Sequence, residues 1–528
     1  MFDILIRGGS IIDGTGKEAY RADLGISGDT IAAIGRFDAS MGASVIDARG
    51  LIVSPGFIDP HTHSDFTILQ DPSGESKIRQ GVTTEVAGNC GYSVFPVNPE
   101  RLSQVKEYTD FFPGELSWQW SDYEGFVKEL AAFGIAPNFA SHVGHGMLRL
   151  AVMGFSDETP GTEKIEEMSR HLRTNLEQGA RGLSLGLAYA PGCYARKEEL
   201  LALGRVVKGF SNTLITVHLR NEGDHLFEAV SEMLEVAEKT GLPVHLCHLK
   251  ASGLKNWGKV ARALEMMEDA NRKGLEITCD VYPYVAGNTL IGYLFPKEDL
   301  TEGTYGLVAR LRQDSERRRI GDHLNATAAH MGGWENIRVA SVKTAKNKVW
   351  EGKNLVEMAR GKGCDEARAL MELFEEEEGA VMVILFLMKE EDVEAVLRHP
   401  LSMVGSDGKI LSVEGPLSEG MPHPRNFGAY PRVIARYVRE KRTLTLPQAI
   451  QKMTSLAAKR FFITKRGEIR EGFYADLTLF DPERIQDKAT FDAPKQYPDG
   501  IEYVLVNGQL VLEKGKRTSA RPGKILGC

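Results

Sequence analysis

Short apolar and β-branched runs, separated by turn residues, fill the first 53 positions of the chain. They predict small antiparallel strands at Phe2–Ile6, Ser10–Ile12, Asp23–Ser27, Thr30–Ile34, Ser44–Ile46 and Leu51–Val53. The same pattern returns near the other end, at Ala475–Phe480, Glu502–Val506 and, after an Asn507-Gly508 turn, Gln509–Leu512. We therefore expect residues 1–54 and 461–528 to pair into one small β-sandwich.

Between these ends, buried strands alternate with amphipathic helices such as Val230–Lys239 and Lys259–Lys273. The alternation predicts repeated βα units around a parallel sheet. We expect an α/β fold that closes as a (β/α)8 TIM-type barrel over residues 55–460. Candidate strands end near His63, Cys90, His145, Gly186, His218, His248, Tyr282 and Asp407. Functional side chains should gather on the face where the strand carboxyl ends meet.

The seventh and eighth candidate strands are about 120 residues apart, more than a barrel connection needs. An inserted subdomain is therefore expected at about 287–378. Its charged runs, Arg317–Arg319 and Glu375–Glu378, predict solvent-facing helices that cover the mouth of the barrel. Solvated faces are the simpler explanation of these runs, and partner binding is the alternative.

Composition narrows the possible functions. The 528 residues include 64 basic and 72 acidic side chains, a net charge of −8, without the dense basic stripe that nucleic acid requires. The start of the chain lacks a signal-peptide pattern, and the most apolar run, Ala380–Met388, is far shorter than the roughly 20 residues that span a bilayer. Six scattered cysteines do not form a disulfide framework. We expect a soluble, cytoplasmic enzyme without nucleic-acid or membrane partners.

Histidines and a cysteine occupy several of the predicted strand ends. His61 and His63 are two positions apart, so in a strand both imidazoles face the same side and can bind one ion, although such pairs also arise by chance. Cys90 lies in a glycine-flanked turn after the second strand. It is either a zinc thiolate or a small buried apolar residue.

The fifth and sixth strands each end near one histidine, His218 and His248. His245 is three positions before His248 and faces the opposite side, so it is the structural histidine of the two. Asp407 ends the eighth strand beside a glycine. It either caps a turn or accepts a proton from a metal-bound water and passes it to a leaving group.

Together these residues form a set of ligands that zinc accepts, namely His61, His63, Cys90, His218, His248 and Asp407. Zinc with an open coordination position lowers the pKa of bound water toward about 7 and polarises a carbonyl oxygen. The set therefore predicts hydrolysis of an amide-like bond.

This constellation resembles the amidohydrolase superfamily over essentially the whole chain. Superfamily members that hydrolyse cyclic amides often bridge two metals with a carboxylated lysine on the fourth strand, and Gly182–Tyr189 contains no lysine. Other motifs resemble the N-acyl-D-amino-acid deacylase family, the D-aminoacylases. They are Gly88–Gly91, Ser184–Gly192, His248–Lys250 followed by Gly253, Asp280–Tyr284 and His423–Arg425.

The resemblance implies a tightly bound zinc at Cys90, His218 and His248. It also implies a weaker or empty second metal site that involves His61 and His63. Asp407 would then be the acid and base of the reaction.

The resemblance further implies that Arg425, Lys250 and Tyr282 hold the α-carboxylate of a small-molecule N-acyl amino acid, with Tyr284 a weaker choice than Tyr282. A guanidinium binds a carboxylate through two hydrogen bonds, and lysine adds a point charge. Arg425 is otherwise a surface ion-pair former, and Tyr282 a packing residue. The loop 415–422 is longer than is usual in the family, and Arg425 would miss the site if this loop folded outward.

The predicted function is zinc-dependent hydrolysis of N-acyl-D-amino acids to a carboxylate and a free D-amino acid. The D configuration is implied by the resemblance alone. Two alternatives stay open: a cyclic amidase or dihydroorotase-like enzyme, and a non-catalytic scaffold with the same fold.

Overall fold

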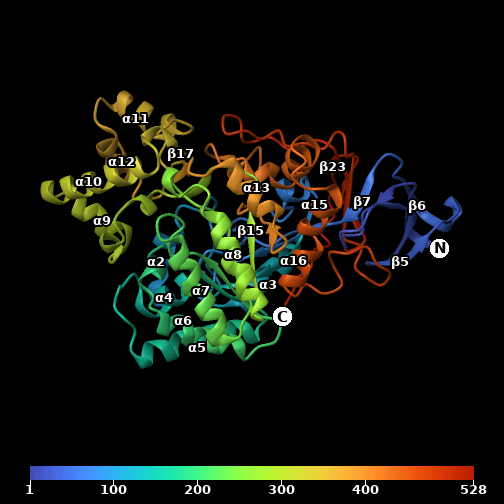
Figure 1. Ribbon diagram of the computed structural model, residues 1–528, viewed down its shortest axis with the longest axis horizontal. Coiled ribbons are helices and arrows are strands. Elements are labelled where there is room, and N and C mark those ends of the chain that lie inside the picture. The colour runs from blue at the N-terminus through green and yellow to red at the C-terminus, as the bar shows by residue number, and fades with distance from the viewer. Residues whose placement is uncertain (528) are drawn as a thin grey trace.

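The structure, a computed structural model, describes residues 1–527. Parallel strands form a barrel at its centre (Figure 1). In chain order they are β8 (Phe57–Asp59), β9 (Val82–Ala87), β10 (Asn138–Ser141) with its continuation β11 (Val143–Gly144), β12 (Gly182–Gly186), β13 (Leu214–His218), β14 (Val244–Leu246), β15 (Ile277–Val281) and β19 (Ser402–Val404). The last and first strands are joined because the amide of Asp407 donates to the carbonyl of His61 over 2.8 Å. The predicted barrel is confirmed.

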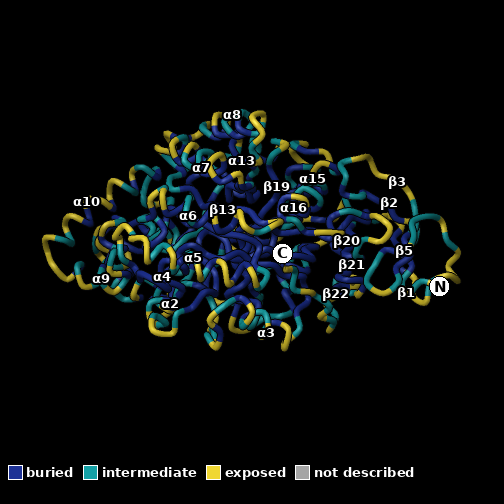
Figure 2. The backbone as a smooth tube through the Cα atoms, turned by 90° about the horizontal axis from the view of Figure 1, so that it is seen from below, coloured by how far each residue is buried: buried dark blue, intermediate teal, exposed yellow. Residues whose placement is uncertain are grey.

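Helices cover the outside of the barrel because each has one apolar face. They include α3 (Tyr123–Phe133), α4 (His145–Met153), α5 (Thr162–Glu177), α6 (Lys197–Lys208), α7 (Leu226–Thr240), α8 (Lys259–Arg272), α13 (Glu390–Arg398), α15 (Leu446–Met453) and α16 (Ser455–Arg460). In α7 the buried positions Val230, Met233 and Ala237 recur every three or four residues. Buried backbone fills the centre around β13 (Figure 2). Within residues 1–527, every helix is too short or too polar to cross a bilayer.

Strands from both ends of the chain form two facing sheets beside the barrel. The first sheet contains β1 (Phe2–Arg7), β4 (Asp23–Ser27), β5 (Thr30–Gly35) and β6 (Gly42–Asp47). The second combines β2 (Ser10–Ile11), β3 (Tyr20–Arg21) and β7 (Ile52–Pro55) with β20 (Leu477–Phe480), β21 (Ile501–Val506), β22 (Gln509–Glu513) and β23 (Lys516–Arg517). Leu24 from one sheet and Leu477 and Leu505 from the other share one apolar core.

The sequence pattern predicts that these strands are antiparallel, and for two pairs this is wrong. Strand β1 pairs with β6 in parallel, and β2 pairs with β7 in parallel. The chain crosses to the other sheet between the members of each pair, which supplies the long connection that a parallel pair needs. Apolar alternation reports that a strand exists but not its direction.

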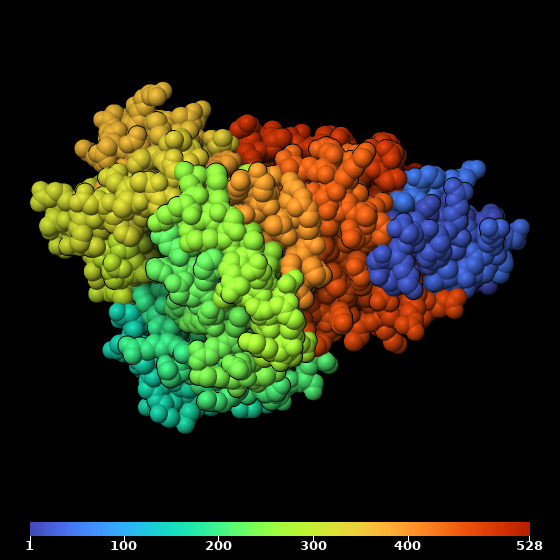
Figure 3. Space-filling view, viewed as in Figure 1, coloured from blue at the N-terminus to red at the C-terminus, as the bar shows by residue number. Residues whose placement is uncertain are grey.

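The insertion between β15 and β19 forms a subdomain at the end of the barrel opposite to the N-terminal strands (Figures 1 and 3). Its helices are α9 (Gly303–Leu311), α10 (Asp314–His330), α11 (Leu355–Lys362) and α12 (Glu366–Glu376). It also contains an antiparallel sheet in the order β16–β18–β17, which the charged sequence did not suggest. These strands are β16 (Gly287–Leu290), β17 (Ile337–Ser341) and β18 (Met382–Leu385).

A buried polar network ties the sandwich to the barrel. Arg466 forms an ion pair with Asp476 and donates to Asn507 Oδ1 over 2.7 Å. Asn138 of barrel strand β10 donates to Asp476 Oδ2 over 3.0 Å and accepts from Asn507 Nδ2 over 2.8 Å. All four side chains are buried, so each depends on the others for its hydrogen bonds.

Replacing Asp476 by Ala should lower the free energy of unfolding by about 3–5 kcal/mol, because it leaves the buried Arg466 charge without its partner. The matched control is Asp492→Ala, which removes an exposed partner of Arg338 and should cost less than about 1 kcal/mol. Urea unfolding of both variants measures the difference. Equal midpoints would show that the network does not stabilise the fold.

Candidate metal centre and active site

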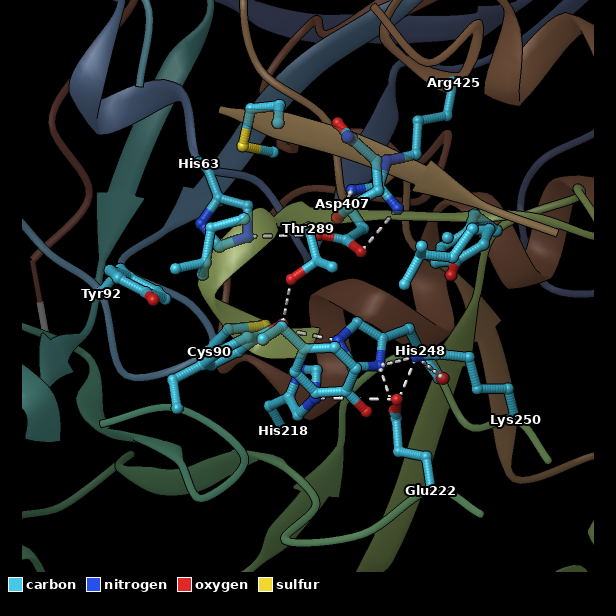
Figure 4. Close-up of a pocket in the computed structure, with 18 of the residues that line it drawn as sticks. His63, Cys90, Tyr92, His218, Glu222, His248, Lys250, Thr289, Asp407 and Arg425 are labelled. Carbon is cyan, nitrogen blue, oxygen red and sulfur yellow. Dashed lines mark hydrogen bonds and ion pairs between the residues drawn. The ribbon is translucent and has the colours of Figure 1, made fainter. Parts of the chain in front are cut away.

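Three of the predicted ligands meet at the carboxyl ends of barrel strands. Cys90 follows β9, His218 ends β13 and His248 follows β14. Their donor atoms lie within 4.8 Å of one another, and all three residues are buried. Cys90 Sγ is 3.4 Å from His248 Nε2, and neither ring nitrogen of His218 has a hydrogen-bond partner among residues 1–527. Figure 4 shows this cluster on one side of a cavity.

A second donor group shares the same thiol. His61, His63, Cys90 and Asp407 also offer donor atoms within 4.8 Å of one another. His61 Nε2 lies 3.3 Å from Cys90 Sγ, and His63 Nε2 lies 3.2 Å from Asp407 Oδ1. The structure therefore brings all six predicted ligands together, and Cys90 belongs to both groups.

These donors fit zinc. Thiolate sulfur and imidazole nitrogen are ligands that zinc prefers, and three protein donors leave a coordination position open. A buried imidazole without partners is costly, and ion binding would satisfy a nitrogen of His218. Cys90, His218 and His248 would hold one zinc, and His61 with His63 a second.

The Cys90 thiol is poised to ionise. Burial alone would raise its pKa, but the adjacent Cys247 and the charges of His61 and His248 hold that pKa well below its usual range. A thiolate is the form of cysteine that binds metals.

Strained backbone fixes three of these residues. Cys90, His248 and Asp407 have φ angles of 54°, 37° and 51°, in the left-handed region that residues other than glycine seldom adopt. Such conformations persist only where the surroundings enforce them, and they are frequent at functional sites. Close packing leaves the Cys90 turn little freedom, since a Cβ at Gly186 on β12 would lie 2.0 Å from the Cys90 carbonyl oxygen.

Asp280 orients two of the histidines from β15. Its carboxylate accepts from His61 Nδ1 over 3.0 Å, from His245 Nε2 over 2.8 Å and from the backbone amide of His248 over 2.9 Å. Burial would raise the pKa of Asp280, but His61 and His245 hold it far below its usual range. The hydrogen bond on Nδ1 leaves His61 Nε2 directed at the Cys90 sulfur. His245 contacts Asp280 and lies outside both donor groups, as a structural histidine would.

Glu222 plays the same part on the opposite side. Its Oε1 lies 3.0 Å from His248 Nδ1 and accepts from Lys250 Nζ over 2.6 Å, while Oε2 lies 3.6 Å from His218 Nε2. Burial would raise its pKa, but Lys250 and the two histidines lower it to about 2. Glu222 therefore stays ionised and holds the imidazoles in place.

The predicted substrate-binding residues surround Tyr282. Arg425 begins α14 (Arg425–Arg432), lies 4.9 Å from the centre of the Tyr282 ring and pairs with Asp407 Oδ2 over 2.8 Å. Lys250 Nζ lies 5.8 Å from the same ring. The long loop before Arg425 does not carry it away, because Met421 donates to Ala340 O in the insertion over 2.6 Å.

Tyr284, the weaker choice, lies outside this group. Its ring packs edge-on against His423 at 5.0 Å and under the Arg432 guanidinium at 4.7 Å.

Beside the donor clusters is a cavity (Figure 4). Aromatic side chains form one part of its wall, and the insertion supplies Asn288, Thr289 and Leu290 from β16 and Met382 and Leu385 from β18. The insertion thus shapes the pocket itself as well as covering the mouth of the barrel.

A family model described as Amidohydrolase family matches residues 44–312 and 318–512. The N-acyl-D-glutamate deacylase of Alcaligenes xylosoxydans xylosoxydans is 37% identical over 525 residues, which are 99% of this chain and 96% of that protein. The crystal structure of N-acyl-D-glutamate deacylase from Bordetella bronchiseptica, with zinc and a phosphonate inhibitor, matches with a TM-score of 0.85 and 34% identity over 100% of both chains. A structure from work on the binuclear metal centre of D-aminoacylase matches with a TM-score of 0.83 and 32% identity, again over 100% of both chains. The chain belongs to the amidohydrolase family.

This amidohydrolase is a metal-dependent enzyme of the D-aminoacylase type, as its motifs had suggested. Its fourth barrel strand, β12, has no lysine that could bridge two metals. The sulfur of Cys90 is instead common to both donor groups.

Sequence reasoning missed Glu222 and Asp280. Asp280 lies in a motif that the sequence analysis quoted, but no role was assigned to it. Glu222 lies four residues after the ligand His218, in the loop that follows β13. Asp280 lies on β15, next to the strand that His248 follows. Metal-binding histidines commonly donate their second nitrogen to such a carboxylate, and this is the signal that would have found them.

Replacing Cys90 by Ala should abolish tight zinc binding, because both donor groups lose their common sulfur. Cys279→Ala, which removes another buried free cysteine outside both groups, should keep the full zinc content. Elemental analysis of the two purified variants gives the comparison. Wild-type zinc content in Cys90→Ala would contradict the assignment.

Replacing Glu222 by Gln should weaken zinc binding about 10- to 100-fold while the fold is kept, because His218 and His248 lose a charged neighbour. Competition with a chelator measures the affinity. Glu232→Gln, which weakens the Arg220 ion pair outside the site, is the control and should bind zinc as the wild type does.

Proposed function

We propose that the protein hydrolyses the amide bond of N-acyl-D-amino acids and releases a carboxylate and a free D-amino acid. The observation that carries this proposal is Asp407, a carboxylate that shares a donor group with His61, His63 and Cys90 and pairs with Arg425. The N-acyl-D-glutamate deacylase and D-aminoacylase relatives support the substrate class.

Cys90, His218 and His248 would hold the catalytic zinc, and His61 and His63 a second, weaker one. Zinc in the relative from Bordetella bronchiseptica and the binuclear centre of D-aminoacylase support this choice of metal. When bound, zinc supplies Lewis-acid polarisation of the acyl oxygen and a more acidic water molecule.

Asp407 moves the protons of the reaction. Burial would raise the pKa of its carboxyl, but Arg425 and His61 hold that pKa well below its usual range, so the group begins as a base. Its Oδ1, 3.2 Å from His63 Nε2, accepts a proton from the attacking water. Asp407 then gives this proton to the departing nitrogen, as a general base that becomes a general acid.

Arg425, Tyr282 and Lys250 orient the amino-acid half of the substrate. Nη1 of Arg425 contacts Asp407, and Nη2 donates to the carbonyl of Asn288 over 3.4 Å. The remaining N–H groups of its planar fork would bind the substrate α-carboxylate. Lys250 is anchored by Glu222 over 2.6 Å and adds its charge from a fixed position. Tyr282 lies between the two cations.

Replacing Asp407 by Asn should leave one zinc bound at Cys90, His218 and His248 and reduce kcat on the order of 10³-fold, because the amide cannot accept the proton. The control is Asp487→Asn, which alters an ion pair with Arg432 outside the cluster. Near-normal turnover by Asp407→Asn would exclude Asp407 as the acid and base.

A stereo-defined panel tests the substrate class. The zinc-loaded protein should release free amino acid from N-acetyl-D-amino acids faster than from their L enantiomers. It should not open hydantoins, dihydrouracil or dihydroorotate. Ring opening as the main activity would replace this proposal by the cyclic-amidase alternative.

A further inference from the structure

Two of the three cationic side chains that line the cavity beside the donor clusters (the inner cavity) are paired with carboxylates, and the third is not. The cations of this cavity are Lys250, Lys409 and Arg425, and its carboxylates are Glu222 and Asp407. Lys250 pairs with Glu222 over 2.6 Å, and Arg425 pairs with Asp407 over 2.8 Å. Nζ of Lys409 has no hydrogen-bond or ion-pair partner among residues 1–527. The Phe112 ring lies 4.9 Å from Nζ, and the charges of Arg425 and Asp407 also act on this side chain.

The backbone of Lys409 is held in position, while its side-chain nitrogen is left without a partner. Its backbone amide donates to Asn426 Oδ1 over 2.8 Å, which fixes the residue two positions after Asp407. Lys409 lines the inner cavity and also a second, larger cavity (the outer cavity), which shares Phe112 and Met382 with the first. Lys409 thus lies at the boundary between the two cavities.

Lys409 does not belong to the cation pair around Tyr282. It lies against Phe112, whose ring stacks on Phe66 at 3.8 Å and is 5.7 Å from the ring of His63. Arg425 and Lys250 lie instead over Tyr282. The pocket thus has two separate cationic points, on two different aromatic walls.

We propose that Lys409 binds a second carboxylate of the substrate, so that N-acyl amino acids with two negative charges are preferred. This inference rests on the proposed function. An ammonium group on an apolar wall without a partner is poorly stabilised, and a charge-assisted hydrogen bond to a carboxylate compensates it. The second carboxylate belongs either to an acidic amino-acid side chain or to a dicarboxylic acyl group.

The test compares kcat/KM of wild-type protein and Lys409→Met on two matched substrate pairs. N-acetyl-D-glutamate against N-acetyl-D-glutamine reports a side-chain carboxylate, and N-succinyl-D-leucine against N-acetyl-D-leucine reports an acyl carboxylate. In wild type the acidic member of one pair should be preferred. In Lys409→Met that preference should fall on the order of 10²-fold, mainly through KM, and Lys409→Arg should retain most of it.

Lys106→Met is the matched control, because Lys106 lines the outer cavity but not the inner one. It should keep the wild-type preference, which separates a contact at Lys409 from a general loss of positive charge. Zinc content and thermal unfolding verify each variant, and Lys409→Gln replaces Lys409→Met if the latter fails to fold.

Two results overturn the inference while the proposed function stands. One is hydrolysis of the neutral substrates without any preference for the acidic ones, or with a preference that Lys409→Met retains. The other is an equal loss on all four substrates, which would assign Lys409 to the α-carboxylate. If none of the four is hydrolysed by wild type, the proposed function and the inference both fail.

Discussion

The sulfur of Cys90 is common to both donor groups, and the arrangement of the active face depends on it. The turn that carries it leaves β9 in a left-handed conformation and packs against Gly186 of β12 with no room for a side chain. Contact between β12 and the turn after β9 thereby fixes Cys90, whose sulfur lies among His61, His63, His218 and His248.

Buried carboxylates make this concentration of histidines possible. Asp280 and Glu222 each contact more than one imidazole, and their negative charges compensate buried groups that would otherwise lose their protons or their orientation. Both carboxylates are themselves kept ionised by the groups they hold. The predicted metal ligands and these two carboxylates therefore depend on one another for both their charge and their orientation.

The sequence predicted the candidate metal ligands well because the type and position of each side chain along its strand were sufficient to recognise it. Strand ends that carry histidine, cysteine or aspartate were recognisable because parallel strands bring their ends together. Glu222 was not, since a carboxylate in a charged loop reveals its role only when its neighbours in space are known. The sheet of β16, β17 and β18 was hidden for a similar reason. Although β18 lies in the apolar run Ala380–Met388, its partners are far away along the chain, and the three strands become a sheet only through pairing. The parallel strand pairs of the sandwich depend on the path of the chain between the two sheets. The alternation of apolar and polar residues along a strand does not predict that path.

The insertion contributes walls to the reaction cavity without contributing a donor to either cluster. The barrel rim supplies every donor and also Lys409, whereas β16 and β18 supply another part of the pocket wall. This division makes the region between β15 and β19 a natural unit for exchange between homologous enzymes. A chimera built at those two boundaries would keep the donors and Lys409 of one parent and take part of its pocket wall from the other.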